Sequence, residues 1–337
     1  MERLRNAITN KFPSKRIVII GDLVADKFLN GTIARVSREA PVFILRHDET
    51  EMRAGGAANA AVNAGALGAM PVVVGIVGND ENGKGLVAEM SAAGADCSGV
   101  IFADARRTTT KMRVLAGHHY APKQQVIRID YEDDTEIDAA VILQLREGLA
   151  AACDGAAAIV FSDYNYGVAT AELIADALGL AEEHSIPLIV DSRSRLTGFS
   201  GATSATPNQD EVGAILGRDF TDADCERLRA EMGLKSLLVT RGNKGMTLLQ
   251  EGFEPLALPV VGSSVPVDVT GAGDTVIAVF ALGVASGLSF AEAAELANHA
   301  GGAVVMKRGT ASVTPTELLD SLLHSPVIQT LEAERMP

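Results

Sequence analysis

The segment best suited to chemistry is residues 268–275, with the sequence Asp-Val-Thr-Gly-Ala-Gly-Asp-Thr. It comes directly before an apolar stretch with the composition of a helix. Gly271, Ala272 and Gly273 would let backbone N–H groups converge at the N-terminus of that helix, where the helix dipole favours an anion. Asp274 follows in the first turn, where it could accept a proton from an attacking hydroxyl. The pattern predicts an anion hole beside a general base, as phosphoryl transfer requires. The alternative is that Asp274 is only a favourable acid in a first helical turn.

Two further segments carry groups suited to binding sugar hydroxyls. Gly55 and Gly56 precede Asn59 at an expected helix start; small residues there allow close approach of a ligand, and Asn59 offers both a donor and an acceptor. Asp22 and Asp26 follow the first expected strand, and ligands of open parallel sheets lie beyond the carboxyl ends of strands. The alternatives are a tightly packed helix start and a pair of solvated turn acids.

Two other segments could bind nucleotide phosphates. Asn208 and Glu211 are three residues apart and could hold a hydrated Mg²⁺ or the phosphates, although the same spacing is typical of a helix capping box. Thr240 ends an expected strand and is followed by a turn that contains Gly242 and Gly245. A hairpin explains this turn fully, and a phosphate could also lie on its backbone.

Short β-branched runs alternate with stretches of helical periodicity along the chain. This alternation predicts an α/β fold with a mostly parallel central sheet and helices on both faces. The expected strands are 16–20, 72–77, 157–162, 187–191 and 236–240, and the expected helices are 56–67, 84–93, 137–153, 169–183, 274–286 and 290–306.

Two segments, residues 27–53 and 106–130, lack helical periodicity and alternate as strands do. We expect them to form a small β-sheet lid that projects from the main domain, covers the site and excludes water during phosphoryl transfer. No linker or repeat marks a second unit, so residues 1–337 are expected to form one domain. The exposed edges of such a lid favour a homodimer.

Charge and composition restrict the partners. The net charge of −14 argues against nucleic acid, although residues 1–130 carry 17 Lys+Arg against 13 Asp+Glu and would favour an anionic ligand. Cys97, Cys153 and Cys225 form no CxxC pair, which is typical of a reduced, cytoplasmic protein. No apolar stretch approaches the length of a membrane span or a signal sequence, so we expect no membrane partner.

Taken together, and in this order along residues 16–322, these segments resemble the ribokinase/PfkB family of carbohydrate kinases. The resemblance implies a ribokinase-like fold and ATP as the phosphoryl donor. It implies Asp274 as the base, residues 271–273 as the anion hole, and Asn208 with Glu211 as the motif for Mg²⁺ and ATP, with Mg²⁺ held through water. It also assigns Asn298 to the nucleotide site and a monovalent cation such as K⁺ to Asp268 and Thr270.

Within this family the chain is most similar to the kinases of D-glycero-D-manno-heptose 7-phosphate. The likeness implies that the anomeric hydroxyl is the acceptor and that a group of polar residues binds the sugar phosphate, namely Arg35, Lys111, Arg113, Arg128 and Asp163. The chain departs from their pattern in two places: Tyr166 stands where Lys is common, and Asp191-Ser192-Arg193 replaces Asp-Pro-Lys.

Three alternatives stay open at this point. The first is a kinase for another sugar, sugar phosphate or nucleoside. The second is a non-catalytic sugar or nucleotide sensor on the same fold, which the intact Asp274 motif disfavours because a pure binder needs no base. The third is a nicotinamide dehydrogenase, which is disfavoured because no G-x-G-x-x-G follows the first strand.

Overall fold

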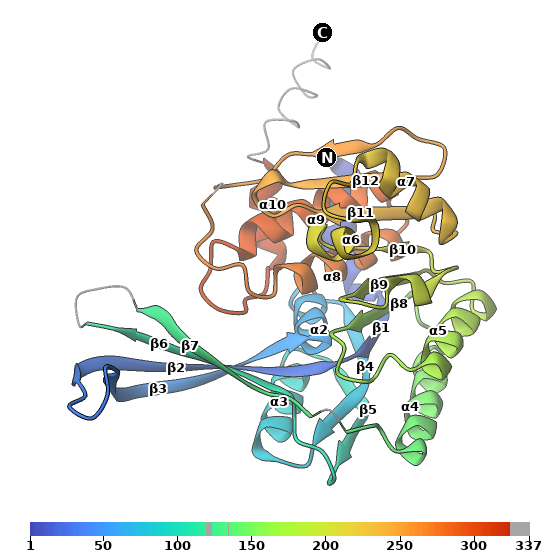
Figure 1. The fold of residues 1–337 in the computed structure, drawn as a ribbon. Coiled ribbons are helices and arrows are strands. Elements are labelled where there is room, and N and C mark those ends of the chain that lie inside the picture. The colour runs from blue at the N-terminus through green and yellow to red at the C-terminus, as the bar shows by residue number, and fades with distance from the viewer. Residues whose placement is uncertain (119–122, 134, 264, 324–337) are drawn as a thin grey trace.

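Two β-sheets of different size organise the protein (Figure 1). The computed structural model describes residues 1–118, 123–133, 135–263 and 265–323. The main sheet has nine strands in the order β13-β12-β11-β10-β9-β8-β1-β4-β5, parallel from β11 to β5 and antiparallel at β12 and β13. Its strands are β1 Arg16–Gly21, β4 Met70–Gly78, β5 Asp96–Ala103, β8 Ala158–Asp163, β9 Leu188–Ser192, β10 Ser204–Ala205, β11 Ser236–Thr240, β12 Met246–Gln250 and β13 Leu256–Leu258.

Helices cover both faces of the main sheet, as the alternating sequence pattern predicts. One face carries α2, α3, α8, α9 and α10, and the other carries α4, α5, α6 and α7. The helices are α1 Glu2–Asn6, α2 Ala57–Ala66, α3 Glu81–Ala92, α4 Ala139–Ala152, α5 Ala171–Glu183, α6 Gln209–Leu216, α7 Asp222–Glu231, α8 Ala272–Ala285, α9 Phe290–Val304 and α10 Pro315–Leu323.

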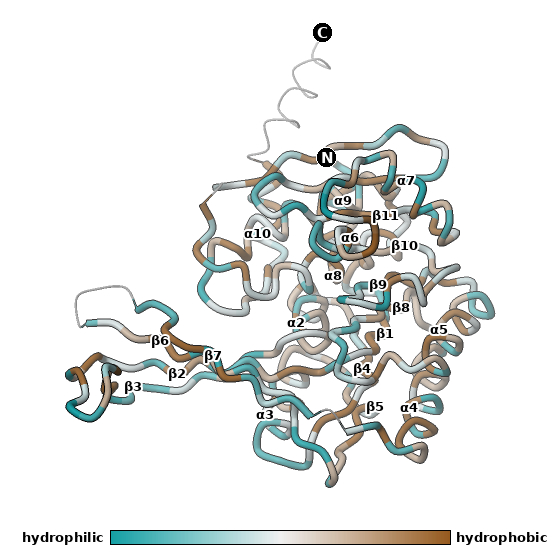
Figure 2. Tube along the Cα trace, in the orientation of Figure 1, coloured by the Kyte–Doolittle hydropathy of each residue, from teal (hydrophilic) through white to brown (hydrophobic). Residues whose placement is uncertain are grey.

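The central strands are hydrophobic on both sides because each side faces a core. Ile17 and Ile19 of β1 pack in the core under α2 and α8, whereas Val18 and Ile20 pack in the core under α4 and α5. Figure 2 shows these hydrophobic runs at the centre of the main sheet. None of the helices in the described part of the chain is long and apolar enough to cross a membrane.

The lid is a separate four-stranded sheet in the order β3-β2-β6-β7 and projects away from the main sheet (Figure 1). Its strands are β2 Leu23–Val36, β3 Phe43–Gly56, β6 Thr110–Gly117 and β7 Gln124–Tyr131. β2–β3 and β6–β7 are antiparallel hairpins, and β2 pairs with β6 in parallel. The expected small β-sheet is therefore confirmed, with its first hairpin extending to Leu23 and Gly56, and its role in covering the site stays a prediction. Residues 119–122 of its second segment lie outside the described residues.

The lid register determines which side chains face the main body. Asp26 of β2 lies beside Lys111 of β6, and Phe28 lies beside Arg113. Arg113 in turn lies opposite Arg128 of β7. Because residues level with one another on paired strands share a face, the register brings Asp26 and the three basic residues to the side of the lid nearest the carboxyl edge of the main sheet.

Candidate active site

Asp274 is buried in the first turn of α8, with 2% of its surface exposed. The Asn59 amide donates to its Oδ2 at 2.9 Å, and the Tyr164 hydroxyl donates to its Oδ1 at 2.7 Å. Burial raises the pKa of Asp274 to about 7, although both hydrogen bonds act in the opposite direction. A carboxyl group with a pKa near neutrality is suited to accept a proton from a hydroxyl at physiological pH.

The start of α8 provides unpaired backbone donors next to this carboxylate. Gly271 has a φ of 77°, a left-handed conformation that glycine adopts without strain, and it turns the chain into the helix. The first helical hydrogen bond runs from the Thr275 N–H to the carbonyl of Gly271, so the N–H groups of Gly273 and Asp274 have no acceptor within the helix. The N–H of Ala272 donates to the Val269 carbonyl at 3.3 Å, and the anion hole at residues 271–273 stays a prediction.

Two cavities meet at this turn. A largely apolar groove of about 160 Å³ is lined by Thr240, Gly242, Gly245 and Asn298, together with Met246, Val260, Val261 and Val276. A polar cleft of about 270 Å³ contains Asp274. Val269 and Gly273 line both cavities. An elongated ligand in the groove would therefore pass Gly273 and reach Asp274 in the cleft. Four of the six residues that were assigned to the nucleotide therefore share one groove.

Asn208 and Glu211 lie in the polar cleft rather than in the groove. They form the capping box of α6, in which Asn208 accepts from the Glu211 N–H at 3.0 Å and Glu211 accepts from the Asn208 N–H at 2.8 Å. Burial raises the pKa of Glu211; burial and the charge of Glu211 raise that of Asp191, which lines the same cleft. The capping role of Asn208 and Glu211 is thus present. In addition, the carboxyl groups of Asp191 and Glu211 lie in one cleft, where a cation would compensate their charges.

These carboxyl groups fit a hydrated Mg²⁺. The described residues contain no cluster of three or more His, Cys, Asp or Glu side chains arranged as a metal site. Mg²⁺ in kinases is commonly held by one or two carboxylates, water and substrate phosphates, so a full protein cage is not required. Asp191 and Glu211 are the groups that would hold it.

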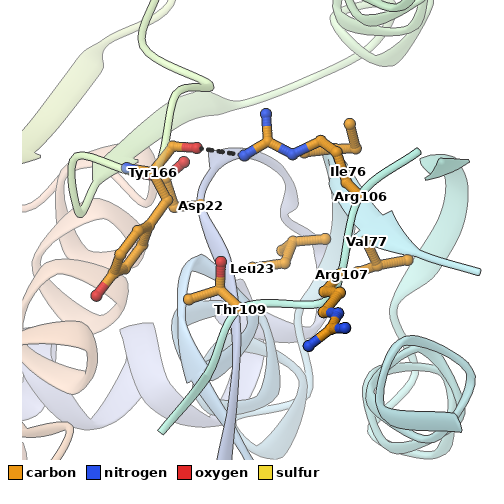
Figure 3. A pocket seen from close by; sticks show the side chains of 8 residues that line it. All are labelled: Asp22, Leu23, Ile76, Val77, Arg106, Arg107, Thr109 and Tyr166. Carbon is orange, nitrogen blue, oxygen red and sulfur yellow. Dashed lines mark hydrogen bonds between the residues drawn. The ribbon is translucent and has the colours of Figure 1, made fainter. Parts of the chain in front are cut away.

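Asp22 does not face the cleft, which corrects the expected role in binding sugar hydroxyls. Its carboxylate accepts the backbone N–H groups of Tyr164 at 2.8 Å, Tyr166 at 3.0 Å and Val168 at 3.2 Å. Figure 3 shows Asp22 beside Tyr166, whose carbonyl accepts from Arg106 at 3.1 Å. Asp22 therefore anchors the loop of residues 164–168, and its hydrogen-bonding capacity is used within the protein.

Asn59 also has a role different from the expected one. Its amide donates to the Asp274 carboxylate and to the Gly271 carbonyl, at 3.1 Å for the latter, while its Oδ1 accepts from Asn63 at 3.0 Å. It is 2% exposed and is not among the residues that line the cleft. Asn59 thus holds the base and the turn before α8 in register rather than offering its amide to a sugar.

Asp26 and Gly56 line the cleft, whereas Gly55, which was also expected to bind the sugar, does not. Asp26 lines the cleft and accepts from Arg113 at 2.5 Å and from Thr310 at 3.0 Å. A Cβ atom on Gly55 would lie 2.6 Å from Oδ2 of Asp26, so only glycine leaves room for this carboxylate. Gly56 lines the cleft directly.

The expected phosphate-binding residues divide into two groups. Lys111, Arg113 and Arg128 line the cleft with Asp163. Arg35 does not, because it is exposed near the outer end of β2, whereas Asp26 lies near the start of that strand. The assignment of Arg35 to the sugar phosphate is therefore corrected within this chain, and the roles of the other four stay predictions.

Asp268 and Thr270 form a closed turn beside the cleft. Asp268 accepts from the Thr270 N–H at 3.0 Å, from the Thr270 hydroxyl at 2.7 Å and from the Gly309 N–H at 2.9 Å. Thr270 lines the cleft. These bonds connect the turn before α8 to residues 308–310, and the expected monovalent cation stays a prediction.

The structure adds four residues that the sequence-based site omitted. Tyr164 contacts Asp274, Thr310 contacts Asp26, and Asp191 and Arg193 line the same cleft. Asp191 lies near the end of β9 and Arg193 follows it, at the carboxyl edge of the sheet, so the rule that selected Asp22 also applied to them. Thr310 carried no such signal, because it is brought to Asp26 from the far end of the chain.

A parallel sheet covered on both faces, a lid near its carboxyl edge and a buried carboxylate at a glycine-rich helix start define a ribokinase-like kinase. The family model of the pfkB family carbohydrate kinases matches residues 14–317. The chain therefore belongs to the pfkB family of carbohydrate kinases.

Curated relatives extend beyond this chain. The bifunctional protein HldE of Caulobacter vibrioides is 40% identical over 314 residues, which cover 91% of this chain and 63% of the relative. The bifunctional protein HldE of Geobacter sulfurreducens is 39% identical over 311 residues, which cover 90% and 62% respectively. The chain thus spans a little under two thirds of the length of these relatives.

Solved structures show the same fold at low sequence identity. A ribokinase of Arabidopsis thaliana, solved with ribose and ATP, has a TM-score of 0.69 and 18% identity, with 93% of this chain and 100% of that chain covered. A phosphofructokinase-2 mutant from Escherichia coli has a TM-score of 0.74 and 17% identity, with 92% and 98% covered. The expected ribokinase-like fold is confirmed.

Proposed function

We propose that this chain uses Mg²⁺ and ATP to phosphorylate the anomeric hydroxyl of D-glycero-D-manno-heptose 7-phosphate. The observation that carries the proposal is the position of Asp274, buried where an apolar groove meets a cleft lined by basic residues. The groove suits an adenine nucleotide, and the cleft suits an acceptor that already carries a phosphate.

The basic residues of the cleft support a phosphorylated acceptor. Lys111 is buried, and its ammonium group lies with Arg113, Arg128 and Arg193 around the cleft. Arg113 is already paired with Asp26, whereas Arg128 is half exposed and pairs with Asp130 of its own strand. Arginine and lysine at such positions bind phosphate through charge-assisted hydrogen bonds.

In the proposed reaction, Asp274 accepts the proton of the acceptor hydroxyl while the hydroxyl oxygen forms a bond to the γ-phosphorus. The bond between the γ-phosphorus and its bridging oxygen breaks, and the electron pair leaves with ADP. The N–H groups at the start of α8 stabilise the negative charge on the transferring group. When bound, Mg²⁺ would neutralise phosphate charge beside Asp191 and Glu211.

We expect Arg128→Ala to raise the KM for heptose 7-phosphate about ten- to hundredfold and to leave kcat and the KM for ATP nearly unchanged. The loss of one charge-assisted hydrogen bond costs roughly 1.5–3 kcal/mol, and about 1.4 kcal/mol corresponds to a factor of ten. The measurement is ATP consumption with heptose 7-phosphate, ribose, fructose and fructose 6-phosphate. Arg35→Ala, on the lid but outside the cleft, is the matched control.

The acceptor panel separates the proposed function from its alternatives. Turnover of another acceptor in place of the heptose phosphate would keep the kinase and reject this substrate. No turnover of any acceptor would favour a sensor. An equal effect of Arg128→Ala on phosphorylated and unphosphorylated sugars would contradict its proposed role.

We also propose that two copies pair through their lids. β7 is an edge strand, and it exposes 53% of Ile127 and 39% of Ile129. An apolar edge strand with unpaired backbone groups is a site for pairing with a second sheet.

We place the protein in the cytoplasm, because three free cysteines fit a reducing compartment.

Replacing both Ile127 and Ile129 with Lys is expected to convert a dimer into a single chain of 35.1 kDa. Two charges on the paired edge would oppose association, as charged residues on natural edge strands do. Light scattering after gel filtration measures the mass. Leu143→Lys, at a residue of α4 that is 53% exposed, is the control and should stay dimeric. A wild-type mass of one chain would reject the proposed dimer.

A further inference from the structure

Tyr164 contacts the proposed base directly. It lies in the loop after β8, and its hydroxyl donates to Oδ1 of Asp274 at 2.7 Å. The Asn59 amide donates to the other carboxylate oxygen. Each oxygen of a carboxylate can accept more than one hydrogen bond, so both contacts leave acceptor capacity for a substrate hydroxyl.

Two cations hold the ring of Tyr164. The Lys111 ammonium lies 5.2 Å from the ring centroid, and the Arg193 guanidinium carbon lies 5.3 Å from it. Both distances are within the range of cation–π attraction, which is stronger where the groups are shielded from water. The ring is thereby held in the orientation that directs its hydroxyl at Asp274.

The backbone of Tyr164 is also fixed. Its N–H donates to Asp22, which accepts from Tyr166 and Val168 in the same loop. Arg106 donates to the carbonyl of Tyr166, as Figure 3 shows, and to that of Asp133 at 3.1 Å. The loop is therefore connected both to the end of β1 and to the segment that follows the lid.

We propose that Tyr164 is a positioning residue for phosphoryl transfer, whose hydroxyl, together with the Asn59 amide, orients the Asp274 carboxylate and favours its ionised form. The inference rests on the proposed role of Asp274 as the base. It assigns a function to the Tyr164 hydroxyl, which a phenylalanine of the same shape would lack.

The groups around Asp274 determine whether its pKa rises or falls when the Tyr164 hydroxyl is removed. The groups that face it are Asp26 from β2, Lys111 from β6, Tyr164 from the loop after β8 and Asp191 from β9. Burial raises the pKa of Asp274, Asp26 raises it further, and the bonds from Asn59 and Tyr164 lower it. Burial also raises the pKa of Tyr164 well above its ordinary value, so its hydroxyl remains a donor throughout the working range.

The test is the pH dependence of kcat in Tyr164→Phe. Without the hydroxyl, the pKa of Asp274 rises, and we expect the acid limb to move up by about one pH unit. The rate should then fall about tenfold at pH values below the limb and recover at high pH. Tyr166→Phe is the matched control, because its hydroxyl bonds to Glu132 at 2.8 Å and its loss should leave the acid limb in place.

A second variant reverses the sign. Incorporation of 3-fluorotyrosine at position 164 keeps the ring and makes the hydroxyl a stronger donor, so the acid limb should move to lower pH. An equal loss of kcat at every pH in Tyr164→Phe, or an unmoved limb in both variants, would overturn the inference.

Asp274→Asn separates this inference from the proposed function. If Asp274→Asn keeps its activity, the assignment of the base fails and the role of Tyr164 fails with it. If Asp274→Asn is inactive while the Tyr164 variants keep the wild-type limb, only the inference about Tyr164 is overturned. Circular dichroism of each variant confirms that the fold is retained.

Discussion

Asp274→Asn is expected to lose catalysis by about 10²–10⁴-fold in kcat, the usual contribution of a positioned general base. Asparagine has the same shape but cannot accept the proton of the acceptor hydroxyl. Its oxygen can accept from Asn59 and its amide can donate to the Tyr164 oxygen, so the surrounding contacts are retained. The KM values for both substrates should change little, because the substitution removes an interaction made only in the transition state.

The same substitution should stabilise the protein at alkaline pH. The folded chain raises the pKa of the Asp274 carboxyl from 3.8 to about 7. A carboxyl group with a raised folded pKa contributes most stability below its unfolded pKa and loses that contribution as pH rises towards 7. Above this range the buried charge costs on the order of 4 kcal/mol, and asparagine carries no charge.

Thermal unfolding of wild type and Asp274→Asn at about pH 8 and about pH 4.5 measures the effect. The variant should melt at a higher temperature at the higher pH, and the difference should shrink at the lower pH. Glu147→Gln, at an exposed position of α4, removes a charge that is not buried and should show no such trend. High activity of Asp274→Asn would reject Asp274 as the base. A melting temperature of the variant below that of wild type at the higher pH would reject the proposed free-energy cost of the buried charge.

The sequence predicted the main sheet because its central strands are buried on both faces and therefore read as apolar runs. β1, β4, β8, β9 and β11 were all expected, and β11–β12 was expected as a hairpin. β5 was missed because it is an edge strand with alternating exposure and a glycine, and β10 because it has only two residues. Helix α7 was missed, and α6 was indicated only by its capping box, because both are short and carry many polar residues.

The site was predicted where its chemistry is local. The turn before α8 and the capping box of α6 are each contained in a few consecutive residues. Asp22 and Asn59 were assigned to the sugar because their partners are distant in sequence: the amides of residues 164–168 for Asp22, and Gly271 with Asp274 for Asn59. No spacing rule predicts that such groups are already hydrogen-bonded within the folded chain.

Arg35 illustrates a different limit. The sequence predicted a basic lid, and Lys111, Arg113 and Arg128 do face the cleft. Which basic residues do so depends on the register of the strands and on the distance along β2 from the main body. Neither quantity can be read from composition, and a long strand carries Arg35 away from the site.

Gly271, directly before α8, and Gly273, in its first turn, should respond differently to alanine. Gly271 has a φ of 77°, and a Cβ atom there would overlap Asn59 and lie 2.8 Å from Cγ2 of Thr310. The backbone strain alone costs roughly 1–3 kcal/mol. Displacement of Asn59 would also remove a hydrogen bond from Asp274. Gly271→Ala should therefore lose both stability and activity.

Gly273→Ala should lose activity while keeping stability. A Cβ atom on Gly273 meets nothing within 4 Å, and its φ is not in the left-handed region, so alanine fits the first turn of α8. The added methyl group would lie where the groove and the cleft meet, next to the unpaired N–H groups. Loss of such donor access typically costs about 10²–10³ in rate.

Measured together, melting temperature and kcat/KM distinguish the two glycine variants. A drop in both quantities for Gly271→Ala, with a drop in kcat/KM alone for Gly273→Ala, is expected if Gly271 shapes the turn and Gly273 borders the path of the transferring group. Full activity of Gly273→Ala would place that path elsewhere, and wild-type stability of Gly271→Ala would show that the turn tolerates a side chain. The contrast separates a glycine needed for its backbone conformation from one needed for the space that it leaves open.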